Sequence, residues 1–238
     1  MRQTGSAYRA VAEAAARRYT PAGRFATRYA LGKLRHDPVF AAILAQGLIP
    51  DRARLVDLGC GQGLLLALLV AAIGAFGRAE WPAGWPPPPR PVSMVGFDVG
   101  QRAIALARMA LASHARIGRA DLRTVELPAC DAIAIIDVLH YVDAAAQEAA
   151  LAKCAAALDV GGVLLLRVGD AGAGWRFALT RIADQLATLA RDRTWPRLHS
   201  RRLADWIALI ERLGFEVQSQ PARAGTPFAN FLLIARRR

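Results

Sequence analysis

Three glycines at alternate positions, Gly59, Gly61 and Gly63, follow the aspartate Asp57 in residues 55–63. An apolar strand that ends at an acid, a tight loop and a helix start are expected here in that order. Glycines let a ligand approach the backbone, and they adopt torsions that residues with a Cβ reach only with strain. The stretch therefore predicts a loop that holds a nucleotide-like ligand.

The spacing of these glycines narrows the class of ligand. A dinucleotide fingerprint has the pattern G-x-G-x-x-G, whereas this loop has G-x-G-x-G, and no G-K-[ST] triplet for a triphosphate follows. The full D-x-G-x-G-x-G pattern resembles the first motif of class I S-adenosylmethionine (SAM) methyltransferases. The resemblance implies that the loop, including Cys60, wraps the methionine end of SAM and that Asp57 helps hold its ammonium group. A purely structural glycine loop is the alternative.

A second acid, Asp98, ends the strand predicted over residues 92–98. In a doubly wound sheet the acid at the end of the second strand faces the ribose, where its carboxylate can accept hydrogen bonds from both hydroxyls. Asp98 lies 41 positions after Asp57 rather than the roughly 20 expected, and a proline-rich insertion over residues 78–91 accounts for the surplus. The pair of strand-end acids makes a SAM site a more specific prediction than either acid alone.

The same resemblance implies further cofactor contacts beyond the glycine loop and Asp98. It places Asp121 beside the adenine amino group, with Ala120 or Leu122 against the ring, although a plain loop aspartate is the alternative for Asp121. The additional residues that it implies are Val99, Ala120, Asp121, Leu122, Asp137 and Val138. A metal site is not expected.

The segment after the fourth predicted strand, residues 137–141, has the sequence D-V-L-H-Y. It matches neither the [DNS]-P-P-[YFW] segment of enzymes that methylate amines of bases nor the Pro-Cys of cytosine C5 enzymes. It resembles the segment of enzymes that methylate small molecules, quinones and lipids. His140, with an ordinary pKa of about 6.5, could accept a phenol or enol proton, or it could pack against SAM. Tyr141 could form a pocket wall or act as an acid.

The pattern of elements predicts an α/β fold: a Rossmann-like, doubly wound, seven-stranded sheet with a C-terminal antiparallel hairpin and an N-terminal helical cap. Residues 1–50 form the cap and residues 51–238 the methyltransferase domain. In the cap, Thr20 and Pro21 are expected to start a second helix, and Asp37 and Pro38 a third. Lys33 of the second helix could face the pocket or the solvent.

The remaining elements are predicted by apolar periodicity and by turn residues. A pair of glycines at 161 and 162 is expected to end the helix before the fifth strand, and Ser200 to cap the last helix. The tryptophans of the insertion are expected to cover the apolar helix that precedes it. The predicted strands cover residues 55–57, 92–98, 116–120, 131–137, 163–168, 215–220 and 230–235, and the helices 64–76, 101–113, 144–158 and 175–191.

The net charge is +12, and the excess lies at the two ends, with +6 over residues 1–50 and +7 over residues 171–238. This excess of positive charge can be interpreted as a solvated basic surface or as a binding surface for an acidic substrate or partner. Residues 32–40, 174–181 and 225–230 resemble methyltransferases of bacterial aryl-polyene and pigment pathways. That resemblance implies an aromatic or acyl acceptor, presented by an acidic acyl carrier protein.

The cysteines Cys60, Cys130 and Cys154 form no C-x-x-C pair, which argues against disulfides and a zinc site. With no apolar leader and no long apolar run, a cytoplasmic protein is expected. Rival functions are an RNA methyltransferase, suggested by the charge, and a SAM-binding scaffold without activity. An NAD-dependent enzyme is excluded by the glycine spacing.

Overall fold

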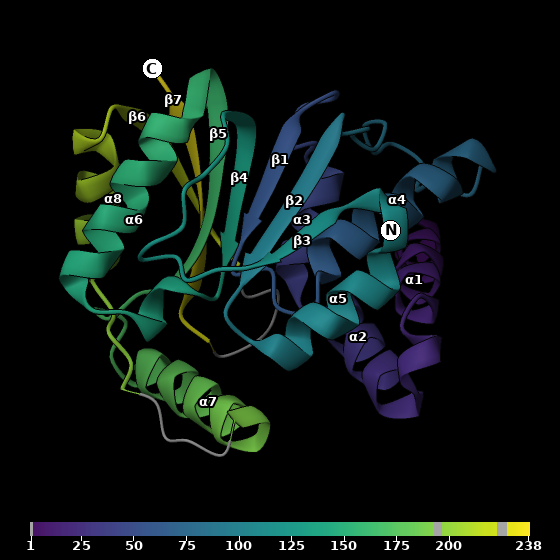
Figure 1. Ribbon diagram of the computed structural model, residues 1–238, viewed down its shortest axis with the longest axis horizontal. Helices are drawn as coiled ribbons and strands as arrows, with labels where there is room; N and C mark the ends of the chain where they lie inside the picture. The colour runs from purple at the N-terminus through teal and green to yellow at the C-terminus, as the bar shows by residue number, and fades with distance from the viewer. Residues whose placement is uncertain (1, 193–196, 223–227) are drawn as a thin grey trace.

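The computed structural model describes residues 2–192, 197–222 and 228–238. It contains a seven-stranded sheet with helices on both faces (Figure 1). The strand order is β3-β2-β1-β4-β5-β7-β6, and β7 runs antiparallel to both of its neighbours. The strands are β1 (Arg54–Leu58), β2 (Ser93–Asp98), β3 (Arg116–Arg119), β4 (Cys130–Ile136), β5 (Leu158–Gly169), β6 (Phe215–Pro221) and β7 (Asn230–Arg237). The fold class predicted from the sequence is confirmed.

Two hydrophobic cores lie on the two faces of the sheet. Successive side chains of β4 point to opposite faces of the sheet, so Ala132 and Ala134 belong to one core and Ile133 and Ile135 to the other. The first core includes α1 (Arg2–Arg17), α2 (Arg24–His36), α3 (Pro38–Ala45), α4 (Leu64–Gly77) and α5 (Gln101–Leu111). The second includes α6 (Ala144–Ala157) and α8 (Leu203–Arg212), while α7 (Trp175–Asp192) lies beyond the carboxyl ends of the parallel strands (Figure 1).

The second helix begins later than the sequence predicts. Thr20 does not cap it: the Thr20 hydroxyl donates to the carbonyl of Arg17 at 2.7 Å, within a short 3-10 turn over Thr20–Ala22. α2 starts only after Gly23, whose φ of 96° breaks the helical path. The prediction for α3 is confirmed, because the Asp37 carboxylate accepts from the backbone N–H of Val39 at 3.2 Å.

The start of the last helix also differs from the prediction. α8 begins at Leu203 rather than directly after Ser200. The backbone N–H of Leu203 donates to Asp170 Oδ1 at 3.0 Å, so a carboxylate from the loop after β5 takes the capping role. A cap supplied from 33 residues away leaves no local signal in the sequence.

The glycines at 161 and 162 do not end a helix. α6 ends at Ala157 and β5 begins at once with Leu158, so both glycines lie inside the strand. The pairing of β4 with β5 shifts register between Cys130 and Ala132. A Cβ on Gly162 would lie 2.8 Å from the carbonyl oxygen of Asp159. The irregular strand pairing therefore explains the glycine at 162.

The insertion after α4 has no regular secondary structure, and its tryptophans pack inward. Trp81 and Trp85 contact each other edge to face at 5.7 Å between ring centroids, and both pack against the first core. Trp81 also contacts Phe76 at the end of α4, while Trp85 contacts Tyr8 of α1. Among the described residues no helix is long and apolar enough to cross a membrane, and α4, which is apolar throughout, has 14 residues.

Candidate active site

The loops after β1 and β2 are hydrogen bonded to each other. The backbone N–H groups of Gly59 and Cys60 both donate to the carbonyl of Phe97, at 2.7 and 2.9 Å. The N–H of Gly61 donates to Asp98 Oδ2 at 2.8 Å. The two strand-end acids, Asp57 and Asp98, are thereby brought to one place at the carboxyl edge of the sheet.

The three glycines of the loop are needed for different reasons. A Cβ on Gly59 (φ 80°) would overlap the side chain of Val138, and one on Gly63 (φ 75°) would lie 2.8 Å from Leu111. Gly61 (φ 54°) is different, because a Cβ there would meet nothing within 4 Å. Packing within the protein thus explains Gly59 and Gly63, whereas Gly61 borders open space in which a ligand can approach the backbone.

Asp57 is an acid buried beside another acid. Its exposed fraction is 3%, and burial together with the negative charge of Asp98 raises its pKa to about 7. A buried carboxylate that faces another carboxylate is stabilised by a cation. The pair therefore favours a positively charged ligand at the foot of the glycine loop.

Both carboxylate oxygens of Asp98 accept backbone hydrogen bonds. Oδ2 accepts from Gly61 and Oδ1 from Gly100, each at 2.8 Å. Each oxygen of an ionised carboxylate has two lone pairs, so each can accept one further bond from a ligand hydroxyl. Val99, the next residue, is exposed and contributes its carbonyl to Arg119 at 3.2 Å.

Asp121 is engaged by a neighbouring arginine. Arg123 donates to its carboxylate through Nε at 3.0 Å and through Nη2 at 2.5 Å, and this contact lowers the pKa of Asp121. Ala120 and Leu122 pack against the second core, and the Ala120 N–H donates to the carbonyl of Asp98 at 3.0 Å. The predicted adenine contact by Asp121 would therefore compete with Arg123.

Asp137 follows β4 with a left-handed backbone, φ 61°. Arg167 of β5 binds its carboxylate with Nε and Nη2, and Lys33 Nζ lies 3.3 Å from Oδ2. Burial by itself would raise the pKa of Asp137, but Arg167, Lys33 and His140 together lower it well below its usual range. Arg167 was not predicted, although a single charged residue inside the apolar run 163–168 was a signal.

His140 and Tyr141 lie on a short 3-10 turn, Leu139–Tyr141, with ring centroids 4.2 Å apart. Gln147 of α6, which is buried, fixes this turn. Its Nε2 donates to the carbonyls of Leu139 and His199, at 3.1 and 3.0 Å, and the N–H of His199 donates to the carbonyl of His140 at 2.8 Å. Gln147 was not predicted, because a glutamine in an alanine-rich helix has no distinctive pattern.

A family model described as a methyltransferase domain matches residues 28–220. The chain belongs to this methyltransferase family. No curated protein sequence matches it. SAM is the methyl donor, and the acidic pair and the open space at Gly61 fit a cationic nucleoside of this kind.

Solved structures support the fold of this methyltransferase. Magnesium protoporphyrin IX methyltransferase from Synechocystis PCC 6803, with bound S-adenosylhomocysteine (SAH), is 19% identical with a TM-score of 0.57, over 84% of this chain and 80% of that one. Human N-acetylserotonin methyltransferase in complex with SAM is 16% identical with a TM-score of 0.57, over 89% of this chain and 53% of that one. The pyocyanin biosynthetic protein PhzM is 18% identical with a TM-score of 0.60, over 89% and 58%. This chain thus spans just over half the length of the last two.

The N-terminal helices of the methyltransferase are bonded to its glycine loop. Tyr19 is fully buried, and its hydroxyl donates to the carbonyl of Gln62 at 2.8 Å. Arg18 Nε donates to the carbonyl of Ala110 at the end of α5, at 2.6 Å. The N-terminal helices are therefore fixed to the glycine loop by side chains that no sequence motif indicated.

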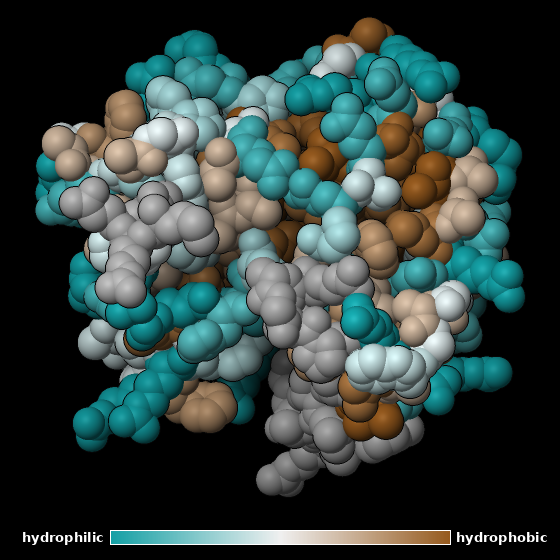
Figure 2. All heavy atoms as spheres, turned by 180° about the vertical axis from the view of Figure 1, so that it is seen from behind, coloured by the Kyte–Doolittle hydropathy of each residue, from teal (hydrophilic) through white to brown (hydrophobic). Residues whose placement is uncertain are grey.

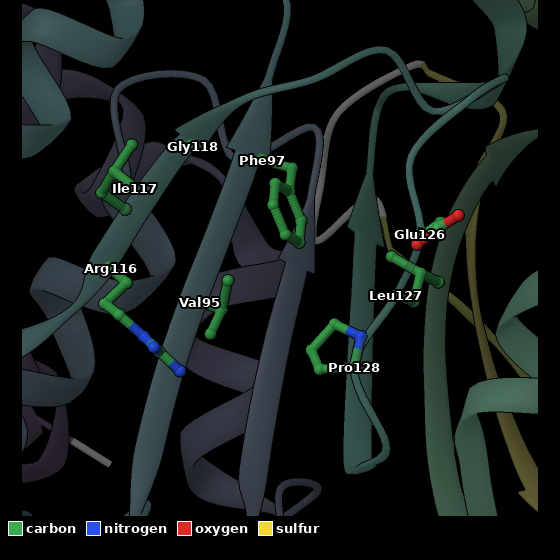
Figure 3. Close-up of a pocket in the computed structure, with 8 residues that line it drawn as sticks. All are labelled: Val95, Phe97, Arg116, Ile117, Gly118, Glu126, Leu127 and Pro128. Atoms are coloured by element: carbon green, nitrogen blue, oxygen red, sulfur yellow. The ribbon is translucent and has the colours of Figure 1, made fainter.

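A groove of about 510 Å³ lies elsewhere, on the face of the sheet beside β2 and β3 (Figure 3). In Figure 3, Val95 and Phe97 of β2 face Leu127 and Pro128 of the segment before β4. The groove is lined by Val95, Phe97, Arg116, Ile117, Gly118, Glu126, Leu127 and Pro128. None of the predicted site residues is among them, but Phe97 directly precedes Asp98, and its carbonyl accepts from the glycine loop.

Proposed function

We propose that this methyltransferase transfers the methyl group of SAM to a small aromatic or acyl acceptor. The observation that carries the proposal is the turn after β4, which presents His140 and Tyr141 in ring contact and has neither the Pro-Pro nor the Pro-Cys segment of base methylation. The resemblance of residues 32–40 and 174–181 to pigment-pathway enzymes supports an aromatic or acyl acceptor. Residues 225–227 of the third similar segment lie outside the described residues.

In this proposal Asp57, Asp98, the glycine loop and the turn residues His140 and Tyr141 each have one role. When bound, SAM supplies a methyl group already activated by its sulfonium. Asp57 holds the ammonium group, the glycine loop holds the methionine end, and Asp98 accepts from the ribose hydroxyls. His140 accepts the proton that the acceptor hydroxyl loses, and Tyr141 forms a wall of the pocket. Positioning supplies much of the rate in such a displacement.

We propose further that an acidic acyl carrier protein presents the acceptor. Residues 14–36 contain six basic residues and no acid, and Arg24 and Arg28 of α2 are exposed. Seen from behind in Figure 2, hydrophilic side chains extend from the lower left of the molecule, the side on which Figure 1 places α2. A positive field near the strand ends would attract an anionic partner, and salt would screen that attraction.

The acceptor can be found by mass spectrometry of metabolites and carrier-bound acyl groups, with and without the gene. Initial rates with that acceptor should then fall several-fold as the salt concentration rises to about 0.5 M, while SAM affinity stays nearly constant. Arg28→Glu should lower the low-salt rate, whereas Arg52→Glu, the same charge change at the amino end of the sheet, should not. A flat salt series would contradict the carrier, and methylation of RNA alone would support the RNA rival.

Substitution of His140 separates a catalytic base from a cofactor contact. His140→Ala should lower the methylation rate by about 10²-fold while SAH affinity stays nearly unchanged. Loss of SAH affinity with an unchanged rate at saturation would assign His140 to cofactor packing. A protein that binds SAH but methylates neither small molecules nor RNA would support the scaffold interpretation.

A further inference from the structure

Arg167 is a buried cation on an inner strand. It lies between Leu166 and Val168 of β5, and 4% of its side chain is exposed. Its strand is hydrogen bonded on both sides, with Ile136 of β4 and Leu232 of β7 opposite it. A charge at such a position is costly unless it is paired and hydrogen bonded. The partners of Arg167 therefore indicate its role.

Four side chains form what we name the Arg167 cluster: Lys33, Asp37, Asp137 and Arg167. Arg167 binds Asp137 with Nε, at 2.5 Å, and with Nη2, and its Nη1 donates to Asp37 Oδ1. Lys33 Nζ lies 2.8 Å from Asp37 Oδ2 and 3.3 Å from Asp137 Oδ2. Two cations and two carboxylates leave the cluster without net charge.

The members of the cluster come from four different elements. Lys33 lies on α2, Asp37 caps α3, Asp137 follows β4 and Arg167 lies on β5. Lys33 and Asp137 are 104 positions apart, and Asp37 and Arg167 are 130 apart. The cluster thus fixes the N-terminal helices to the carboxyl end of the central strand.

Asp137 is the member that leads into the active site. Residues other than glycine rarely adopt its left-handed backbone, and aspartate is among those that do so more often. The next residue, Val138, packs so closely on Gly59 that a Cβ there would overlap it. The turn with His140 follows directly. The backbone at Asp137 therefore determines where Val138 and His140 lie relative to the cofactor loop.

We propose that Arg167 is a positioning residue for methyl transfer. By binding both carboxylate oxygens of Asp137, it holds the left-handed backbone that places Val138 against Gly59 and directs residues 139–141 toward the site. Lys33 and Asp37 complete the neutral cluster, so the N-terminal helices take part in holding the same segment. The inference rests on the proposed role of the glycine loop in binding SAM.

The test must separate positioning from simple charge balance. Arg167→Met alone leaves Lys33 with two carboxylates, of which that of Asp37 is buried, and could prevent folding. The double variant Arg167→Met with Asp137→Asn leaves the neutral pair of Lys33 and Asp37. It therefore restores the charge balance but not the hydrogen bonds between residues 167 and 137. The matched control is Arg54→Met with Asp131→Asn, which removes an equivalent pair from the opposite end of β4.

The double variant at 167 and 137 should bind SAH at least tenfold more weakly than the wild type in calorimetry. Amide hydrogen exchange of residues 138–142 should be faster in it than in the matched control, which should bind SAH as the wild type does. Asp137→Asn alone keeps the contact of Arg167 with Asp37, and its SAH affinity should fall between the two.

Wild-type affinity and unchanged exchange over residues 138–142 in the double variant would overturn the proposal, because the cluster would then act only in folding. A wild-type protein that binds no SAH would contradict the cofactor site itself. The wild-type titration alone gives that second result, so the two failures are distinguishable.

Discussion

At each end of the central strand β4, an arginine from a neighbouring strand binds an aspartate. Near its amino end Arg54 donates to Asp131 through Nε at 2.9 Å and through Nη2 at 2.8 Å. At its carboxyl end Arg167 binds Asp137 through the same two nitrogens. The two arginines differ in burial, since 38% of the Arg54 side chain is exposed and 4% of that of Arg167, whereas the Asp131 and Asp137 side chains are 35% and 30% exposed.

Burial and neighbours give the two pairs different consequences. Water screens the ion pair of the exposed Arg54, so this pair contributes little to stability. Removing a partner of the buried Arg167 leaves an uncompensated charge in the core. The pair at the amino end also contacts Asp159 at the start of β5, far from the glycine loop. The pair at the carboxyl end leads directly into the segment with His140. Identical residue types thus stabilise a strand end in one place and shape the site in the other.

The largest expected effect is on the free energy of unfolding, which should depend much more on Arg167 than on Arg54. Arg167→Met should lower the free energy of unfolding by about 3–5 kcal/mol, because it removes the buried cation that Asp37, whose side chain is 8% exposed, and Asp137 share. For a chain of this length that corresponds to a melting temperature lower by roughly 6–20 °C. Arg54→Met should have a much smaller effect. Thermal and urea denaturation of both variants measure the difference, and equal losses would remove the distinction between the two ends.

Two glycines offer a second comparison between the ends. Gly61 in the cofactor loop and Gly161 near the start of β5 both have positive φ, and a Cβ at either position meets nothing within 4 Å. Valine at either position should cost about 1–2 kcal/mol of backbone strain. Only Gly61→Val should weaken SAH binding, by about 100-fold, because its side chain fills space that the ligand uses. Calorimetry of both variants checks this, and equal affinities would show that Gly61 does not border the ligand.

The acids at the two ends of the sheet should respond differently to pH. Burial and the charge of Asp98 raise the pKa of Asp57 from 3.8 to about 7, whereas hydrogen bonds from Arg54 lower the pKa of Asp131 to about 2. Without ligand, folded Asp57 therefore keeps a proton that the unfolded chain releases near pH 4. This contribution to stability is complete below about pH 4 and is lost as the pH rises through 7.

The same shift predicts how ligand binding depends on pH. The ammonium group of SAH favours ionised Asp57, so SAH affinity should fall as the pH drops below 7, by at most about tenfold per pH unit. Asp57→Asn should remove this dependence and should make the ligand-free protein more stable at pH 8 than the wild type. Asp131→Asn should leave the profile unchanged. Calorimetric titrations with SAH from pH 5 to 8 test this prediction. An SAH affinity of the wild type that does not change with pH would show that Asp57 does not contact the ammonium group.

Local patterns in the sequence were sufficient for much of the fold and for the conformation of the glycine loop. The Asp57 loop and the apolar run after it predict a strand, a turn and α4, because each step depends on adjacent residues. Asp37 and Pro38 predict the start of α3 for the same reason. The positions of Asp57 and Asp98 in one site follow from a general rule of parallel sheets.

Features that depend on distant residues could not be predicted in this way. Asp170, 33 positions before Leu203, took the capping role expected of Ser200. Arg167 finds its partners 30 and 130 positions away, so only its presence in an apolar strand was visible. Gln147 holds the turn with His140 from inside a helix of ordinary composition. Tertiary packing decides such contacts, and no sequence period records them.

The central claim is that the carboxyl edge of the sheet binds SAM through the acids that end β1 and β2. Calorimetry with SAH and with NAD, on the wild type and on Asp98→Ala, tests it most directly. Each charge-assisted hydrogen bond of Asp98 contributes about 1.5–3 kcal/mol, so the variant should bind SAH at least tenfold more weakly, and neither protein should bind NAD. Unchanged SAH affinity in Asp98→Ala, or binding of NAD in place of SAH, would contradict the account.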